Sequence, residues 1–272
     1  MNQWVILSSN LDLKYAFLLP ITAKTWERLG YKSVFMLVGD ETEWNNGPFE
    51  VVLSELKKLV LNGHKLIFVK QLEGYSVWTT ANIIRLYAGC MAIDPEDYAI
   101  IGDSDLFVLK SEFILQRDKN KSVNLWYANA FNHTAIPQYP MCHVGSSIKV
   151  WREIMNIKES DIYTTTLEKM DKAVGRGNDT DTAFNEKFYA TTLRNWSGFP
   201  HQCQFITRPE WKPEHPSDRL DRGNWDLSLW GENTVDAHLP RPALQYWDTI
   251  SVILDKICPE HREWFATYKN KF

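Results

Sequence analysis

Short apolar runs alternate with amphipathic segments over the first hundred residues. The apolar runs predict buried strands at residues 4–8, 33–38, 65–69 and 98–101. The segments between them predict helices at residues 15–29, 50–61 and 79–92. Strands that alternate with helices in this way form parallel sheets wound in βαβ units. The pattern therefore predicts an α/β fold with a mostly parallel, Rossmann-like sheet flanked by helices.

The pattern becomes less regular after residue 110. We expect strands at residues 123–127 and 141–146, and helices at residues 148–156, 165–174 and 264–271, with another beginning near Thr180. Residues 195–242 are rich in Trp, Pro, Asp and His and have no clear period, which is typical of long functional loops. No repeat or linker divides the chain, so we expect one domain over residues 1–272.

Composition and charge narrow the classes of partner. The net charge is −4 without a basic stripe, which argues against nucleic acid and against an anionic membrane surface. No apolar stretch is long enough for a membrane span, and the N-terminus does not resemble a signal peptide. The four cysteines are far apart in sequence, as expected for reduced thiols. These features predict a cytoplasmic protein, for which a bacterial or viral origin fits.

The clearest chemical motif is Asp103-Ser104-Asp105, which follows the predicted strand 98–101 and Gly102. Side chains at i and i+2 of an extended segment point to the same face, so both carboxylates can approach one hard cation. A cation at this place can neutralise a diphosphate leaving group. Ligands of parallel sheets bind beyond the carboxyl ends of the strands, which is where this motif lies.

The motif resembles the Asp-x-Asp signature of the GT-A glycosyltransferases. Four further segments resemble elements of that class, namely 80–88 with Arg85, 141–147 with His143 and Gly145, 193–198 with Trp196, and 236–242 with His238 and Arg241. The last two resemble the retaining families that include glycogenin, although Arg194 stands where those families have proline. The resemblance covers roughly residues 4–250.

The resemblance implies a metal-dependent transferase that moves a sugar from a nucleotide diphosphate, with UDP-sugar as the expected donor, to a saccharide or glycoconjugate. It implies Mn²⁺ or Mg²⁺ bound by Asp103, Asp105 and His238. It further implies phosphate contacts near Arg85, Ser104 and Arg241, and substrate contacts from His143, Gly145 and Trp196. Residues 1–110 would form the nucleotide-sugar-binding half and residues 111–272 the acceptor-binding half. The fold would include a smaller C-terminal subregion on the acceptor side. The 12 tryptophans fit a carbohydrate enzyme, although most are expected in the core.

Topology adds candidates at the ends of the first two strands. Ser8, Ser9 and Asn10 leave strand 4–8, and Asp40 leaves strand 33–38, so each is a candidate nucleotide contact or a plain turn residue. Asp181 and Asp179 precede a helical run, where each is a candidate catalytic base or a helix cap. A transferase that inverts the anomeric configuration of the sugar needs such a base. The resemblance slightly favours a transferase that retains the configuration.

Two other functions remain open at this point. A non-catalytic nucleotide-sugar or carbohydrate-binding protein of the same fold would keep the same segments. A nucleotidyltransferase also uses two aspartates one residue apart, but it needs a Gly-Ser dipeptide upstream, and here Gly89-Cys90 stands in that region. Release of UDP from UDP-sugars with Mn²⁺ would separate the glycosyltransferase from both.

Overall fold

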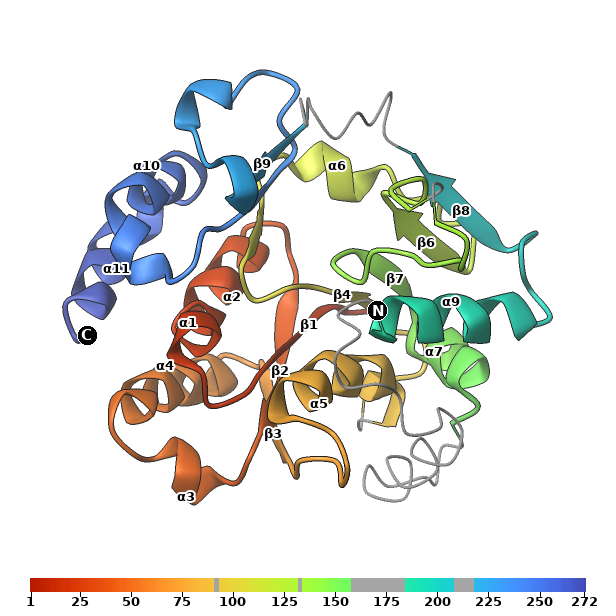
Figure 1. Ribbon diagram of the computed structural model, residues 1–272, viewed down its shortest axis with the longest axis horizontal. Coiled ribbons are helices and arrows are strands. Elements are labelled where there is room, and N and C mark those ends of the chain that lie inside the picture. The colour runs from red at the N-terminus through yellow and green to blue at the C-terminus, as the bar shows by residue number, and fades with distance from the viewer. Residues whose placement is uncertain (91–92, 132–133, 158–183, 208–217) are drawn as a thin grey trace.

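A computed structural model describes residues 1–90, 93–131, 134–157, 184–207 and 218–272. Its centre is a seven-stranded sheet with the strand order β3-β2-β1-β4-β7-β6-β8 (Figure 1). The strands are β1 (Gln3–Ser9), β2 (Lys32–Val38), β3 (Lys65–Val69), β4 (Tyr98–Ile101), β6 (Val123–Trp126), β7 (Val144–Ser147) and β8 (Cys203–Ile206). All neighbours pair in parallel except β7, which is antiparallel to both β4 and β6. The predicted mostly parallel α/β sheet is confirmed.

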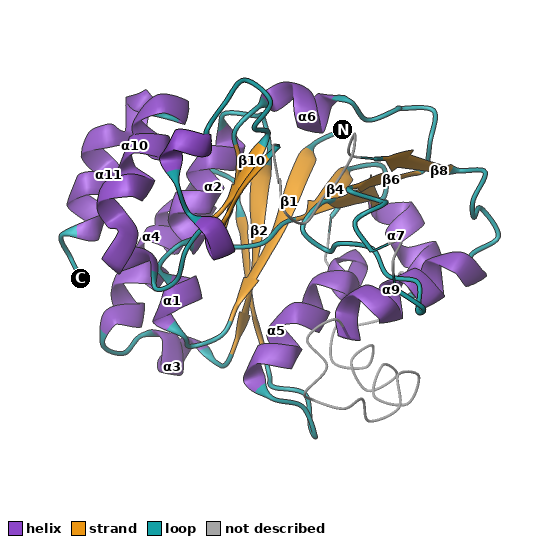
Figure 2. Cartoon of the chain, turned by 45° about the horizontal axis from the view of Figure 1, so that its top comes forward, coloured by secondary structure: helices purple, strands orange, loops and turns teal. Residues whose placement is uncertain are grey.

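Helices cover both faces of this sheet (Figure 2). One face carries α1 (Leu13–Ala16), α2 (Leu19–Glu27) and α4 (Pro48–Leu61), and the other carries α5 (Val77–Ile84), α7 (Ile148–Met155) and α9 (Phe184–Asn195). Alternate residues of β1 supply both cores, because Trp4 and Ile6 join the cluster beneath α5 and α7, while Val5 and Leu7 join the cluster beneath α2 and α4. This explains why the strands are apolar throughout instead of alternating.

A second, three-stranded sheet has the order β5-β10-β9. It is built from β5 (Leu106–Val108), β9 (Arg219–Asp221) and β10 (Asp236–His238). Its apolar residues Phe107, Leu220 and Ala237 join a third core cluster with α10 (Trp247–Ile257) and α11 (Arg262–Lys269). Because β10 pairs with β5, residues 236–238 lie beside residues 106–108, which follow β4 closely in the sequence.

The remaining described elements are short. They are α3 (Glu41–Trp44), α6 (Ser111–Leu115) and the 3₁₀ turns η1 (Arg85–Cys90), η2 (Arg222–Asn224), η3 (Leu227–Leu229), η4 (Ala243–Tyr246) and η5 (Pro259–His261). Among the described residues, none of the helices combines the length and the apolarity that crossing a lipid bilayer requires.

Two predicted helices are interrupted. The segment 15–29 forms α1 and α2 instead of one helix, with Pro20 in the first turn of α2. Proline lacks the N–H that would continue α1, and its ring clashes with the carbonyl four residues earlier. The segment 79–92 forms α5 up to Ile84 and then the 3₁₀ turn η1, where Tyr87 leaves helical dihedral angles.

The second half of the chain differs more from the sequence prediction. The predicted strand 141–146 begins only at Val144, and the loops expected at 195–242 contain β8, β9 and β10. These strands have three or four residues each, which is too short for a period to be recognised. The helix expected at 165–174 and the helix start near Thr180 lie outside the described residues.

Candidate functional site

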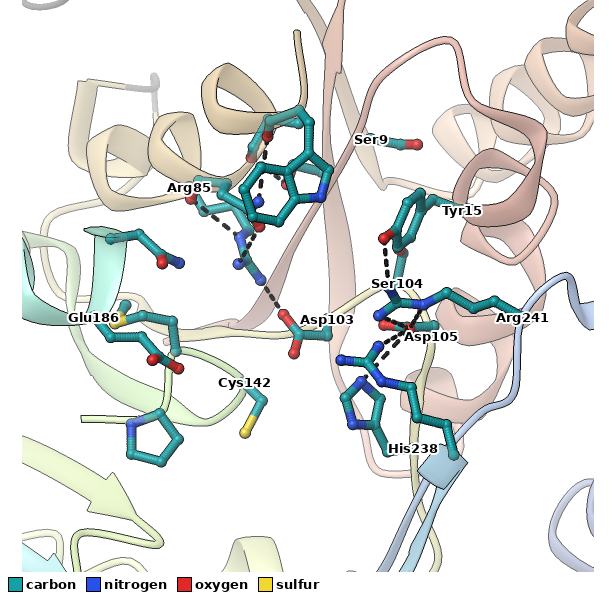
Figure 3. Close-up of a pocket in the computed structure, with 18 of the residues that line it drawn as sticks. Ser9, Tyr15, Arg85, Asp103, Ser104, Asp105, Cys142, Glu186, His238 and Arg241 are labelled. Carbon is teal, nitrogen blue, oxygen red and sulfur yellow. Dashed lines mark hydrogen bonds and ion pairs between the residues drawn. The ribbon is translucent and has the colours of Figure 1, made fainter. Parts of the chain in front are cut away.

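A cavity of about 580 Å³ opens at the carboxyl ends of β1 and β4 (Figure 3). Its lining comes from both halves of the chain, from Ser8 at the end of β1 to Arg241 after β10. Four arginines contribute to the lining (Arg85, Arg219, Arg222 and Arg241), although the protein as a whole has a net charge of −4. The cavity therefore concentrates cationic side chains around the two aspartates.

Gly102 allows the Asp-x-Asp segment to leave the sheet close to β1. A Cβ atom at this position would lie 2.8 Å from Val5 Cγ2 and 3.1 Å from Leu7 Cδ2, which is too close for a side chain. The Gly102 amide donates a hydrogen bond to the Ile6 carbonyl (3.0 Å), which extends the pairing of β4 with β1 by one residue. The two aspartates that follow thus start from a rigid strand end.

Arg85 fixes the first aspartate. Its side chain is 4% exposed, and Nη1 donates to the Gly102 carbonyl (2.8 Å) and to Asp103 Oδ1 (2.5 Å). The residue stands where α5 changes into a 3₁₀ turn, which directs the guanidinium toward the end of β4. Arg85 therefore contacts the carboxylate of Asp103 directly and also holds the backbone of Gly102 beside it.

The three-stranded sheet places His238 beside the second aspartate, Asp105. Leu106 pairs with His238 across β5 and β10, and the Leu239 amide donates to the Asp105 carbonyl (2.8 Å). The pairing places His238 Nε2 3.5 Å from Asp105 Oδ2. Residues separated by more than a hundred positions in the sequence are therefore held together by backbone hydrogen bonds.

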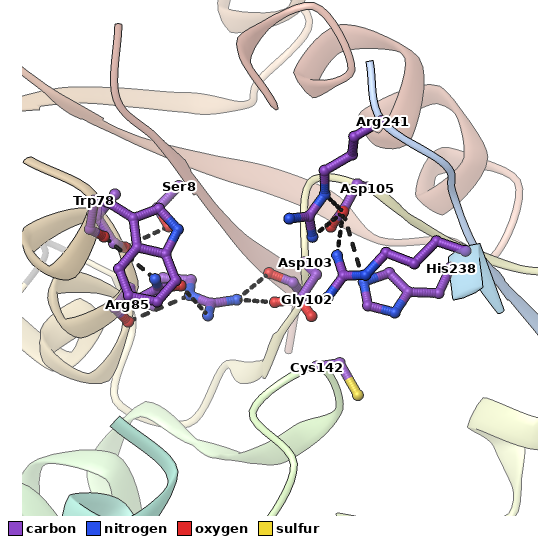
Figure 4. Close-up of polar contacts among 12 residues, drawn as sticks. Ser8, Trp78, Arg85, Gly102, Asp103, Asp105, Cys142, His238 and Arg241 are labelled. Carbon is purple, nitrogen blue, oxygen red and sulfur yellow. Dashed lines mark hydrogen bonds and ion pairs between the residues drawn. The ribbon is translucent and has the colours of Figure 1, made fainter. Parts of the chain in front are cut away.

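Two guanidinium groups contact the same oxygen of Asp105 (Figure 4). Asp105 Oδ2 accepts hydrogen bonds from Arg241 Nε (2.6 Å) and Arg222 Nη1 (3.2 Å). Burial opposes ionisation of Asp105, but His238 and Arg241 outweigh it and keep the pKa of this carboxyl below its ordinary value. Burial also disfavours the imidazolium of His238, but Asp105 outweighs burial and raises the pKa of His238.

A buried ion pair supports the strand that presents His238. Arg219 donates two hydrogen bonds to Asp236, from Nε to Oδ1 (2.7 Å) and from Nη2 to Oδ2 (2.6 Å). The Asp236 side chain is fully buried, and the Arg219 side chain is 13% exposed. Asp236 precedes His238 by two residues on β10, so this pair fixes β9 to β10 at the wall of the cavity, where Arg219 is part of the lining.

Three side chains can hold a divalent cation. Asp103, Asp105 and His238 each offer a ligand atom, and these atoms lie within 4.8 Å of one another. Carboxylates and imidazole are suitable ligands for Mn²⁺, and carboxylates also suit Mg²⁺. The donor set therefore fits the metal that the Asp-x-Asp motif implies.

The serines and the asparagine that leave β1 also line the cavity. Ser8, Ser9, Asn10 and Ser104 all belong to the lining. The Ser8 hydroxyl donates to the Ala81 carbonyl of α5 (2.6 Å), and the Ser9 hydroxyl donates to the Asn10 carbonyl (2.9 Å). The two hydroxyls are therefore oriented by backbone acceptors at the cavity wall.

Asp40, expected near the nucleotide, does not line this cavity. It caps α3, where its carboxylate accepts from the Glu43 amide (2.9 Å) and Glu43 Oε2 accepts from the Asp40 amide (2.8 Å). Hydrogen bonds from Thr42 and the Glu43 amide lower the pKa of this exposed carboxyl. Aspartate ahead of a helix with glutamate three residues later is a capping box, which accounts for Asp40 locally.

The three residues expected at the substrate lie outside the cavity lining. His143 is fully buried beside Trp26 and Phe113, and burial lowers its pKa despite the nearby Asp236. Gly145 belongs to β7, where a Cβ atom would come within 2.3 Å of the Tyr98 hydroxyl oxygen, so its absence makes room for that ring. Trp196 follows α9, and its indole donates to Glu153 (3.4 Å).

Several lining residues have no signal in the sequence. Arg222 and Arg219 fall in the aperiodic segment after residue 195, Tyr15 and Trp78 lie on helices, and Glu186 lies in the first turn of α9. Only the tertiary fold brings these side chains to Asp103 and Asp105. Asp179 and Asp181, the expected catalytic bases, lie outside the described residues.

Comparisons with known proteins were made at the level of sequence and of structure. Neither a protein-family model nor the sequence of a curated protein matches this chain. The structure is similar to the glycosyltransferase GlyE of Streptococcus pneumoniae TIGR4, with a TM-score of 0.51, 14% identity and 99% of this chain aligned. This chain spans 64% of the length of that GlyE chain.

Two other similar structures have lower scores. The galactosyltransferase LgtC, in complex with donor and acceptor sugar analogues, has a TM-score of 0.46 at 14% identity and aligns over 86% of each chain. The mannosyltransferase PcManGT of Pyrobaculum calidifontis has a TM-score of 0.43 at 11% identity, over 94% of this chain and 62% of its own. The strand order, the two aspartates after β4 and the alignment with GlyE agree, and the chain has the GT-A fold.

Proposed function

We propose that this chain is a metal-dependent glycosyltransferase that transfers a sugar from a nucleotide diphosphate donor to a saccharide or glycoconjugate. The observation that supports this most strongly is the convergence of Asp103, Asp105 and His238 in the cavity at the ends of β1 and β4. In open α/β sheets, ligands bind at this edge. UDP-sugar is the proposed donor because the Asp-x-Asp segment resembles enzymes that use it.

The proposed chemistry places positive charge beside the diphosphate leaving group. A divalent cation held by Asp103, Asp105 and His238 would neutralise negative charge that develops on the diphosphate. Arg241 would bind phosphate oxygens, for which a guanidinium fork has matched geometry. Arg85 would orient Asp103 through its hydrogen bond to Oδ1. Ser8, Ser9 and Asn10 would contact the nucleoside at the end of β1.

The two halves expected from the sequence remain part of the proposal, with one refinement. Residues 1–110 supply the end of β1, Arg85 and both aspartates, in keeping with a nucleotide-sugar role. His238, Arg222 and Arg241 come from residues 111–272 and line the same cavity. The acceptor-binding half therefore also contributes to the proposed metal and phosphate sites.

A second cavity of about 440 Å³ supports an acceptor site in residues 111–272. It shares Phe131 with the first cavity, and its wall includes the rings of Tyr139, Phe199 and Phe205. Aromatic rings in a partly polar cavity suit the apolar faces and the hydroxyl groups of sugars. We place the acceptor in the second cavity, on the side that Phe131 shares with the first.

The stereochemical outcome depends on whether a carboxylate serves the acceptor hydroxyl. Inversion needs a base near that hydroxyl, whereas retention does not require one. Asp181 and Asp179 remain the proposed bases, and Glu186 in the first turn of α9 is a further carboxylate at the cavity. We favour retention slightly, and the anomeric configuration of the product, measured by NMR coupling constants, decides between the outcomes.

The direct test is release of UDP from UDP-sugars in the presence of Mn²⁺. We expect release that stops with excess EDTA and falls at least ~100-fold in Asp103→Ala, because a main electrostatic stabiliser is lost. Arg262→Gln is the control, since Arg262 of α11 forms an exposed ion pair with Asp255 of α10 and does not line the cavity. Full activity in EDTA, or an active Asp103→Ala enzyme, would refute the proposed chemistry.

A further inference from the structure

Cationic side chains surround the carboxylate of Asp105. Its side chain is 4% exposed, and Oδ2 is contacted by Arg241 Nη2 (2.5 Å), Arg222 Nη1 (3.2 Å) and His238 Nε2 (3.5 Å). A divalent cation that binds this carboxylate meets two guanidinium charges within a few ångströms. Like charges at that separation repel strongly when water is largely excluded.

Arg222 and Arg241 reach Asp105 from different directions and have different anchors. Arg241 also stacks on the Tyr15 ring, with its guanidinium carbon 4.4 Å from the ring centroid, and donates to the Tyr15 hydroxyl. Arg222 follows β9 directly, and the last residue of β9, Asp221, pairs with His238. Both guanidinium groups are therefore held at the metal-type triad by ordered structure.

The two guanidinium groups have more donors than Asp105 can use. Each group carries five N–H donors, while Asp105 Oδ2 is a single acceptor shared by both. The Arg222 side chain is 39% exposed, and both arginines line the first cavity. A diphosphate offers several charged oxygens, so it can satisfy both forks at once where one carboxylate oxygen cannot.

We propose that Arg222, together with Arg241, forms a diphosphate-binding pair that covers Asp105 until a nucleoside diphosphate is bound. The pair then transfers its hydrogen bonds from Asp105 to phosphate oxygens, and Asp105 becomes available to the cation. This inference rests on the proposed function and assigns Arg222 as a binding residue of that site. It also requires that the cation binds weakly alone and tightly with the diphosphate.

The coupling between the two ligands is reciprocal. If a diphosphate raises the affinity for Mn²⁺ by some factor, Mn²⁺ raises the affinity for the diphosphate by the same factor. Removal of Arg222 should have opposite effects on the two affinities. Mn²⁺ alone should bind more tightly, because a positive charge that repels it is gone. The diphosphate should bind more weakly, because a phosphate contact is lost.

The experiment measures Mn²⁺ binding from the EPR signal of the free ion, with the whole chain alone, with UDP and with inorganic pyrophosphate. We expect Arg222→Gln to bind Mn²⁺ alone about 10-fold more tightly, because one nearby positive charge is gone. We expect the same variant to lose roughly 10-fold or more of the enhancement by UDP. Arg262→Gln, which removes an exposed ion-paired arginine, should match the parent in every arm.

Arg222→Lys provides a second variant with the charge retained. It should bind Mn²⁺ alone as weakly as the parent but show a reduced enhancement, since an ammonium lacks the guanidinium fork. Unchanged or weaker Mn²⁺ binding by Arg222→Gln alone, or an unchanged enhancement, would overturn the assignment of Arg222. Enhancement by pyrophosphate without enhancement by UDP would contradict the proposed UDP-sugar function and leave the diphosphate-binding pair standing.

Discussion

At the scale of single residues, the two aspartates of the motif have different surroundings. Asp103 has a side chain that is 27% exposed and one guanidinium partner, Arg85. Asp105 is almost fully buried and balances Arg222 and Arg241 at once. The same motif therefore contains one partly exposed carboxylate that contacts Arg85 and one buried carboxylate that contacts both Arg222 and Arg241.

This difference predicts separable effects of two matched substitutions. Asp105→Asn should reduce the free energy of unfolding by about 3 kcal/mol, because two guanidinium charges lose their buried partner. Asp103→Asn should cost about 1 kcal/mol, as expected for a more exposed pair. Urea unfolding without metal measures both values. Equal stabilities of the two variants would show that Asp105 has no special role in balancing Arg222 and Arg241.

The residue scale also shows which site residues a sequence can reveal. Asp103 and Asp105 are recognisable because the strand before them and their spacing are local features. Asp40 has an equally local explanation, since Asp40 and Glu43 form a capping box, and that signature outweighs its position after β2. Arg222 has no local signal, because its neighbours form a three-residue strand and a single turn.

At the scale of elements, one histidine connects a helix to a strand through hydrogen bonds. Glu27 of α2 accepts from His64 Nε2 (3.0 Å) and Lys24 Nζ (2.8 Å), while the Ser33 amide of β2 donates to His64 Nδ1 (2.9 Å). The acceptor role of Nδ1 leaves the ring proton on Nε2, directed at Glu27. The residue before β3 thereby connects β2 to α2.

The Glu27 contact predicts a dependence of stability on pH. Burial opposes ionisation, but His64 and Lys24 outweigh it and lower the pKa of Glu27 from 4.5 to about 2. A lowered carboxyl pKa stabilises the fold above the unfolded value, and this contribution is lost as pH falls from 4.5 toward 2.

Glu27→Gln tests this contribution. The difference in unfolding free energy between parent and variant should be larger at pH 6 than at pH 3.5, by about 1 kcal/mol. Urea titrations at both pH values provide the measurement, and Glu50→Gln, on an exposed part of α4, is the control. A difference that stays constant between the two pH values would mean that Glu27 titrates normally in the folded protein.

The buried pair Arg219–Asp236 predicts an asymmetric response within the small sheet. Asp236→Asn should destabilise the protein by about 3–5 kcal/mol, because Arg219 would keep a buried charge without a counter-ion. Replacing both residues, as in Arg219→Met with Asp236→Leu, should restore most of that loss. Thermal and urea unfolding of the single and double variants measure it. A double variant as unstable as the single one would show that the pair itself, and not the unbalanced charge, stabilises β9 and β10.

The length of each helix or strand also determines whether the sequence can predict it. The strands and helices up to residue 110 were largely recognisable, since βαβ units repeat a local pattern and only Pro20 and the turn after Ile84 interrupt it. The sheet β5-β10-β9 was not recognisable, because three-residue strands obtain their stability from distant partners. In the main sheet, the strand expected at residues 141–146 starts only at Val144, so His143 lies before it and Gly145 within it.

At the scale of the whole molecule, the candidate site joins the two ends of the chain. Ser8 and Arg241 line one cavity, and the third core cluster packs Phe17 and Ile21 of the N-terminal region against α10 and α11. A ligand bound between these parts stabilises both at once. The site and the core therefore depend on the same long-range contacts, and binding should be visible in the unfolding of the entire protein.

The last prediction follows from this coupling. A ligand that binds only the folded state at 100 times its dissociation constant adds about 2.7 kcal/mol of stability. For a chain of this size, that corresponds to a rise of roughly 5 °C in the unfolding midpoint. We expect this rise with UDP and Mn²⁺ together, and a much smaller one with either alone, since Asp105 is covered by Arg222 and Arg241.

The unfolding midpoint is measured by tryptophan fluorescence and by far-UV circular dichroism. Both midpoints should shift by the same amount, because the cavity lining connects both halves of the chain. His238→Ala should lose most of the shift when each midpoint is compared with that of the same variant without ligand. Two transitions that separate on ligand addition would show that the halves unfold independently, and an equal shift with Mn²⁺ alone would show that the cation does not need the diphosphate.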